Sequence, residues 1–144
     1  MKITISLLNK IFACSDQQKL FCRVFPLGTT VTLRSLARAR KHDLSVHWFC
    51  HTMLSDSANA RYGTRTTAAY QRYVKVRDAA WETYDKTLGI LDAEGVNPRA
   101  VAQEKYGKIT DAAWKTYCAV CDRVLVALLK NPANLKPELR DLEK

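Results

Sequence analysis

One heptapeptide pattern, Asp-Ala-Ala-Trp-x-Thr-Tyr, occurs at residues 78–84 of this chain and again 33 residues later at residues 111–117. Each copy lies inside a long stretch whose large apolar residues recur at steps of three and four residues. Steps of this size place side chains on one face of a helix, while the charged residues between them face water. The two stretches therefore predict long amphipathic helices over residues 67–93 and 98–130.

The segment between the two predicted helices is short and contains three residues typical of helix ends. Gly95 can adopt the left-handed backbone conformation that ends a helix, Asn97 can cap the next helix, and Pro98 fits its first turn. A connection of this length makes the two helices antiparallel neighbours. We expect Trp81 and Trp114 to be buried in the seam between them, so that the repeat serves helix packing.

Shorter elements flank this predicted hairpin. Residues 32–41 (TLRSLARARK) and 45–54 (SVHWFCHTML) each predict a short helix. Residues 55–66 are rich in Ser, Asp, Asn and Gly, which predicts a polar loop. The charged, proline-containing residues 131–144 predict a tail that forms a frayed turn or a short helix.

These elements predict a mainly all-α protein, a compact bundle of four to five helices that includes the long antiparallel hairpin. Residues 1–31 fit either helices or a small N-terminal β-hairpin. A chain of 144 residues, 47% of them apolar, is the size of one domain that buries a core without metal or disulfides. We expect one helical domain over residues 1–144, divided into an N-terminal segment (1–31), short helices and a loop (32–66), the helical hairpin (67–130) and the tail (131–144).

The positive charge is concentrated in the first half of the chain. Residues 1–77 contain 13 Lys and Arg but 3 acidic residues, whereas residues 78–144 contain 10 Lys and Arg and 11 acidic residues. The first half therefore has a net charge of +10 and the second half a net charge of −1, which together give the net charge of +9. Such asymmetry is typical of a surface that meets a polyanion or an acidic partner. The alternative is a basic protein with a solvated positive face.

Several basic residues in the first half are candidates for contacts with phosphates. Arg34, Arg38 and Lys41 share one face of the helix predicted over residues 32–41, within an arc of about 60°. Guanidinium groups bind phosphates bidentately, and nearby tyrosines can stack on bases unless they are turned into the core. The candidate residues for binding nucleic acid or an acidic partner are Arg34, Arg38, Arg40, Lys41, Arg61, Arg65, Arg72, Lys75 and Arg77.

The two short helices also resemble the spacing of a helix-turn-helix. Lys41 and His42 stand where the turn of that motif usually has glycine. The second helix, over residues 45–54, contains no Arg, Lys, Asn or Gln, and these are the residues that chiefly read base edges. We therefore expect residues 45–54 to form a core helix.

Two residue pairs have spacings that suit metal ligands. His47 and His51 are four residues apart, and Cys118 and Cys121 are three apart. The two side chains of each pair therefore lie on the same face of a predicted helix. Together they could complete a Cys₂His₂ zinc site. Nothing in the sequence brings the pairs together, and buried thiols are ordinary beside an apolar row. We assign no metal and no cofactor.

The sequence contains no motif of a known catalytic type. It lacks a Gly-rich phosphate loop, an HExxH motif and a nucleophile elbow. Its five cysteines cannot all pair, which favours free thiols in a reducing cytosol. No stretch approaches the ~20 apolar residues of a membrane span. We expect a cytoplasmic protein that is not an enzyme and does not enter a membrane.

The sequence thus leaves two functional hypotheses open. In the first, the basic N-terminal half binds nucleic-acid backbone with little reading of bases. In the second, the chain docks on a partner protein as an inhibitor, adaptor or assembly subunit, of the kind found among phage and mobile-element accessory proteins. The aromatic hairpin would also suit a homodimer that extends the bundle.

Overall fold

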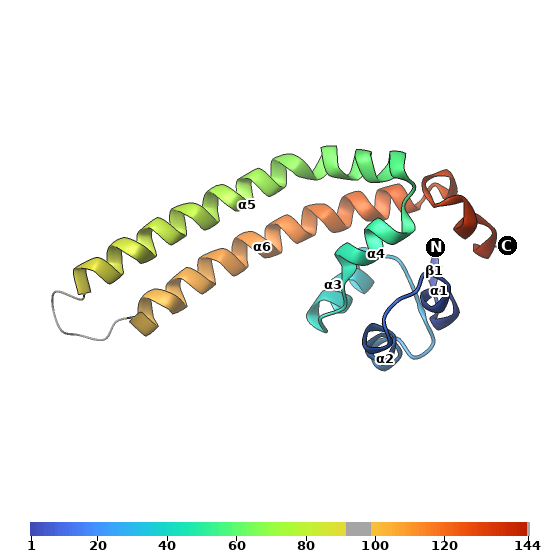
Figure 1. Ribbon diagram of the computed structural model, residues 1–144, viewed down its shortest axis with the longest axis horizontal. Helices are drawn as coiled ribbons and strands as arrows, with labels where there is room; N and C mark the ends of the chain where they lie inside the picture. Colours follow the sequence, from blue (N-terminus) through green and yellow to red (C-terminus); the bar gives the residue numbers. More distant parts are fainter. Residues whose placement is uncertain (92–98, 144) are drawn as a thin grey trace. The chain divides into compact units, whose positions relative to one another are not determined.

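The computed structural model describes residues 1–91 and 99–143 (Figure 1). The chain forms two compact units, which are described separately. Unit 1 consists of Met1–Arg65 and Asp122–Lys144, and unit 2 consists of Thr66–Cys121. Six α-helices, one two-stranded sheet and two 3₁₀ helices lie in the described part of the chain. The single domain expected from the sequence stays a prediction.

Unit 1 is built mainly from short helices. The long helices α5 (Asp56–Leu91) and α6 (Arg99–Leu129) contribute one end each to this unit and form unit 2 with their remaining residues. The other elements of unit 1 are β1 (Lys2–Ile3), α1 (Ile5–Lys10), α2 (Ser15–Val24), β2 (Thr29–Thr30), α3 (Leu33–Lys41), α4 (Val46–Met53), η1 (Pro132–Asn134) and η2 (Pro137–Glu143).

The N-terminal residues form a small antiparallel sheet, with α1 and α2 between its two strands in the sequence. Lys2 pairs with Thr30, and Ile3 pairs with Thr29. Gly28 precedes β2 with a φ of +75°, a conformation that glycine adopts without the steric penalty of a Cβ. The predicted fold class is confirmed: the chain is mainly helical, with a long hairpin of α5 and α6 and a small N-terminal sheet.

The C-terminal residues are part of the core of unit 1. Leu135 is 1% exposed and pairs with Leu54 in an antiparallel bridge, and Leu139 is also buried. The Lys136 amide donates to the Met53 carbonyl at 3.1 Å, which adds a second backbone link. The short-helix alternative predicted for the tail is therefore confirmed by η1 and η2, whereas the frayed turn is wrong for residues 131–140, because Asn134, Leu135 and Leu139 are buried.

The polar loop predicted over residues 55–66 is also wrong, since α5 already begins at Asp56. Ser55 stands before the helix, and its Oγ accepts from the Ala58 amide at 3.4 Å. Ala58 and Tyr62 are buried in unit 1. Burial of this face stabilises a helix whose composition alone favours a loop, because packing outweighs the weak local propensities.

Unit 2 is an antiparallel hairpin, in which α5 and α6 run side by side (Figure 1). The two predicted long helices are confirmed within the described residues, over 67–91 and 99–129, although α5 starts earlier than expected. The connecting turn predicted around Gly95, Asn97 and Pro98 lies outside the described residues.

The repeated sequence places matching aromatic rings in two clusters along the hairpin. In one cluster the rings of Tyr73 and Trp114 lie 5.2 Å apart, and both contact Tyr117. In the other, Trp81 and Tyr106 lie 5.8 Å apart, and both contact Tyr84.

Each ring of one cluster has its equivalent 33 residues away in the other. Tyr73 corresponds to Tyr106, and the two copies of the heptapeptide supply the corresponding Trp and Tyr residues. A ring that lies on α5 in one cluster therefore has its equivalent on α6 in the other cluster. This exchange gives the hairpin an internal two-fold relationship. The repeat serves contact between the helices, as expected, and each copy meets a tyrosine of the opposite helix rather than the other copy.

The expected burial of the two tryptophans is wrong. Trp81 is 54% exposed and Trp114 is 46% exposed, although each ring contacts tyrosines across the seam. A pair of helices covers only the sides that face each other, so rings at the edge of the seam keep one side in water. Tyr70 and Val76, also on the hairpin, are exposed by more than a third.

Candidate nucleic-acid interface

Helix α3 carries the strongest group of candidate cations, and its first turn is fixed by hydrogen bonds. Thr32 caps the helix, because its side chain accepts from the Ser35 amide while the Ser35 side chain accepts from the Thr32 amide. The Ser35 hydroxyl also lies 2.8 Å from the Thr30 carbonyl of β2, to which it can donate. This reciprocal capping satisfies amide groups that would otherwise lack partners, and it ties α3 to the sheet.

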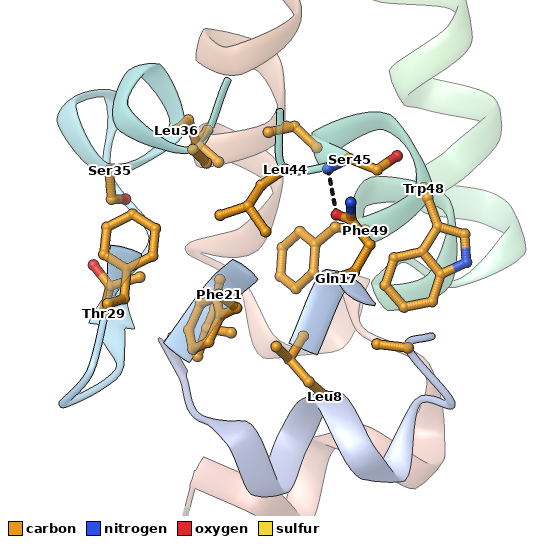
Figure 2. Close-up of a pocket in the computed structure, with 15 residues that line it drawn as sticks. Leu8, Gln17, Phe21, Thr29, Ser35, Leu36, Leu44, Ser45, Trp48 and Phe49 are labelled. Carbon is orange, nitrogen blue, oxygen red and sulfur yellow. Dashed lines mark hydrogen bonds between the residues drawn. The ribbon is translucent and has the colours of Figure 1, made fainter. Parts of the chain in front are cut away.

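The turn that follows α3 is held by a glutamine of α2. Gln17 accepts from the Ser45 amide at 2.9 Å and donates to the Asp43 carbonyl at 3.4 Å. Figure 2 shows the first of these bonds as a dashed line. Asp43 has a φ of +58°, a left-handed conformation that few residues other than glycine adopt. Both ends of α3 are thus positioned by neighbouring elements of unit 1.

The inner face of α3 belongs to the core. Ser35, Leu36 and Ala39 are buried and line a small, mostly apolar cavity of about 60 Å³ (Figure 2). This volume is far below the roughly 300 Å³ at which small-molecule sites begin. The cavity is therefore a packing gap beneath α3 rather than a binding site.

The outer face of α3 presents Arg34, Arg38 and Lys41, all exposed as predicted. None of the three forms an ion pair with a carboxylate in residues 1–91 or 99–143. Arg38 lies over the Phe25 ring, with its guanidinium carbon 5.3 Å from the ring centre, which holds this side chain against the unit. Three cations on one fixed helix face remain available to an anionic partner.

The sequence analysis overlooked Ala37, which is exposed on the same outer face. Its position at one step of three from Arg34 and one step of four from Lys41 would have placed it there. A methyl side chain between longer cations leaves room for a phosphate backbone to approach the helix closely.

Two other predicted cations of unit 1 have internal partners. Arg40 forms a bidentate ion pair with Asp122 of α6, with an Nη2–Oδ1 distance of 2.7 Å. Arg61 donates to Asn134 Oδ1 at 2.5 Å and to the Ser57 carbonyl at 3.4 Å. These arginines link segments of unit 1 that are distant in sequence, and this use competes with contacts to an external anion.

The remaining predicted cations all lie on α5, in two different units. Arg65 is in unit 1, whereas Arg72, Lys75 and Arg77 are in unit 2. The Arg77 side chain donates to Asp78 at 2.8–2.9 Å, and this hydrogen bond and charge raise the pKa of Arg77. Arg65, Arg72 and Lys75 are exposed. The nine candidates therefore fall into groups on α3 and along α5.

The division into units also separates the charge. Unit 1 contains 15 Lys and Arg against 7 acidic residues, a net charge of +8. Unit 2 contains 8 Lys and Arg against 7 acidic residues, a net charge of +1. A polyanion is therefore attracted chiefly to unit 1, whereas the hairpin is nearly neutral.

The candidate metal ligands form two separate pairs. His47 and His51 are neighbours on α4, with their Nε2 atoms 3.2 Å apart, and Cys118 and Cys121 are buried on α6. Partial burial lowers the pKa of His47, and the positive charges of His51 and Arg40 lower it further. No group of three or more His, Cys, Asp or Glu side chains suited to a metal ion occurs among the described residues.

The five cysteines differ in their exposure. Cys14 and Cys22 are exposed free thiols, whereas Cys50, Cys118 and Cys121 are buried free thiols. Helix α4 is a core helix as expected, with Phe49, Cys50 and Met53 all buried.

No protein-family model, curated protein or solved structure matches this chain. Within the described part of the chain, no helix combines the length and hydrophobicity needed to cross a bilayer.

Proposed function

We propose that this chain is a non-enzymatic protein that binds nucleic-acid backbone through the outer face of α3. One observation carries the proposal: Arg34, Arg38 and Lys41 share an exposed helix face and have no carboxylate partner among the described residues. The same unit contains Arg40 and Arg61, whose polar groups are engaged within the protein. The contrast separates cations that hold the fold from cations open to a ligand.

The chemistry of this face favours phosphates over bases. Arg and Lys bind phosphate oxygens strongly, and a rigid helix presents them without a large loss of backbone entropy. The face has no Asn or Gln, the side chains that recognise adenine, and Ala37 contributes only a methyl group. Binding should therefore depend weakly on nucleotide sequence and strongly on salt.

Anisotropy of fluorescein-labelled duplex and single-stranded oligonucleotides, titrated with the full chain at 50 and 200 mM salt, tests this function. Each phosphate contact changes the slope of log K against log salt by about 0.9 for duplex DNA. The double variant Arg34→Ala/Lys41→Ala should weaken binding and reduce that slope by about 2. Arg34→Lys, with Lys41 unchanged, should keep most of the affinity because the charge is retained.

A matched control removes two cations from the nearly neutral hairpin. Lys86 and Lys115 are exposed residues of unit 2, and Lys86→Ala/Lys115→Ala changes the net charge by the same amount. This control should reduce affinity less than the α3 variant. Absence of binding at 50 mM salt, or equal losses in the two double variants, would contradict the proposed function.

A further inference from the structure

The hairpin has a second surface that the α3 proposal does not use. Two half-grooves run along one face of unit 2, between α5 and α6. The first half-groove includes Ala69, Arg72 and Val76 in its lining, and the second includes Ala102 and Lys105. Ile109 lines both, so the two halves form one continuous surface, called here the hairpin groove.

The two half-grooves are equivalent by the 33-residue repeat. Ala69 corresponds to Ala102, Arg72 to Lys105 and Val76 to Ile109. Eight residues of the first half-groove have their equivalents in the lining of the second. The internal two-fold relationship of the aromatic clusters therefore extends to this face, and the duplicated sequence creates the same local surface twice.

The hairpin groove shares four tyrosines with the aromatic clusters: Tyr73 and Tyr117 line the first half-groove, and Tyr84 and Tyr106 line the second. Val76 and Trp81 are five residues apart on α5, which corresponds to about 140° around a helix. Neither tryptophan lines either half-groove. Small and branched side chains complete the lining, and Val76 and Ile109 keep 41% and 37% of their surface exposed. Small residues at a helix surface allow another helix to pack closely.

Each half-groove contains one cation at an equivalent position. Arg72 and Lys105 are exposed, and neither forms an ion pair within the described residues. Arg72 precedes Tyr73, which contacts Tyr117, whereas Lys105 lies about twelve residues before Tyr117 on α6. At 1.5 Å per residue, the two cations are separated by ~18 Å along the hairpin.

We infer that the hairpin groove binds an amphipathic helix of a partner protein, whose apolar stripe is flanked by two carboxylates about twelve residues apart. Twelve residues span ~18 Å and turn about 120° around the helix, so the two carboxylates lie on opposite flanks of the apolar stripe. Arg72 on α5 and Lys105 on α6 likewise stand on opposite sides of the groove. This spacing matches the separation of Arg72 and Lys105. The apolar stripe covers the floor of the groove, as in other complexes in which a helix occupies a groove.

Charge distinguishes this occupant from the other candidates. A second copy of the chain, packed groove to groove, would bring Arg72 and Lys105 of both copies together, and like charges across an interface are unfavourable. Nucleic acid would meet only one cation in each half-groove and would leave an apolar floor uncovered. An acidic amphipathic helix both covers the apolar side chains of the groove and pairs with its two cations.

A labelled synthetic helix of about 22 residues tests the inference against the full chain. Its apolar stripe is built from Leu and Ala, and two Glu stand twelve positions apart on opposite flanks of that stripe, while a second peptide has Lys at those positions. Fluorescence anisotropy at 50 mM salt should show tighter binding of the Glu peptide. Arg72→Glu/Lys105→Glu should lower the affinity for the Glu peptide by about fivefold or more and raise the affinity for the Lys peptide.

The control is Lys86→Glu/Lys115→Glu, an equal charge change at exposed hairpin positions outside the groove lining. It should change peptide affinity by less than about twofold. Three results would overturn the inference: no binding of the Glu peptide, equal effects of the two reversals, or displacement of the peptide by a short duplex. Sedimentation showing a dimer that dissociates on Arg72→Glu/Lys105→Glu would assign the groove to a second copy instead. Because Arg34 and Lys41 are unchanged throughout, failure here leaves the α3 proposal standing.

Discussion

Arg40 of α3 and Asp122 of α6, 82 positions apart in the sequence, form a bidentate ion pair in unit 1. Both nitrogens of the Arg40 fork that take part, Nε and Nη2, lie 2.7–3.2 Å from the carboxylate oxygens. The Asp122 side chain is 9% exposed and that of Arg40 is 26% exposed. The pair therefore excludes most solvent, and losing one partner leaves a charge poorly solvated.

Removing only the carboxylate should be strongly destabilising. Asp122→Ala is expected to lower the free energy of unfolding by about 3 kcal/mol, because the Arg40 charge stays largely buried without its counter-charge. The double variant Arg40→Met/Asp122→Leu should recover most of this loss, since it leaves no unpaired charge. Urea denaturation followed by circular dichroism measures both. A control at the exposed pair, Lys19→Ala, should change stability by less than about 1 kcal/mol. Equal stability of Asp122→Ala and the wild type would disprove a role for the pair.

Two glycine-to-alanine substitutions should change the free energy of unfolding in opposite directions. Gly28 has a φ of +75°, and a Cβ there would lie 2.6 Å from the Ile3 carbonyl oxygen of β1. Gly28→Ala should therefore cost about 2 kcal/mol or more, from backbone strain and from displacement of the sheet. Gly63 lies within α5 with open space around its Cα, so Gly63→Ala should raise stability by roughly 1 kcal/mol. Thermal and urea unfolding compare the two variants, and a shared sign would contradict the expectation.

Acidification should destabilise unit 1 in part through His47. Burial, with repulsion from His51 and Arg40, lowers the folded-state pKa of His47 below its ordinary value of about 6.5. The unfolded chain therefore binds this proton more readily than the folded chain. The contribution of neutral His47 to stability is fully present above pH ~6.5 and is lost as the pH falls through the folded-state pKa.

The His47→Gln variant isolates this contribution. The loss of unfolding free energy between pH 7.5 and pH 5.0 should be smaller in this variant than in the wild type. His42→Gln, the same substitution at an exposed residue of the α3–α4 turn, provides the comparison. Parallel losses in the wild type and His47→Gln would show that His47 does not contribute.

The outer face of α3 could be predicted because it depends on residues close together in sequence. Thr32 lies directly before α3 and caps it, and the steps of four and three among Arg34, Arg38 and Lys41 place them on one exposed face. Capping and helical periodicity act within one or two turns, so a short segment contains the information needed.

The internal pairing of Arg40 and Arg61 could not be predicted from nearby residues. Both look like their neighbours in composition, yet each meets a partner more than 70 residues away, Asp122 and Asn134. Residues 55–66 show the same limit, because the burial of Tyr62 in unit 1 favours a helix where the polar composition favours a loop.

The sequence by itself determined the two long helices, the 33-residue spacing that duplicates their ring contacts, and the basic face of α3, because each follows from the geometry of a single helix. Only the tertiary structure decided which cations pair internally, that Leu135 and Leu139 are buried in the core of unit 1, and that Trp81 and Trp114 stay half exposed. The reason is that burial and pairing depend on which distant segments cover a given face, and periodicity along one helix does not contain that information.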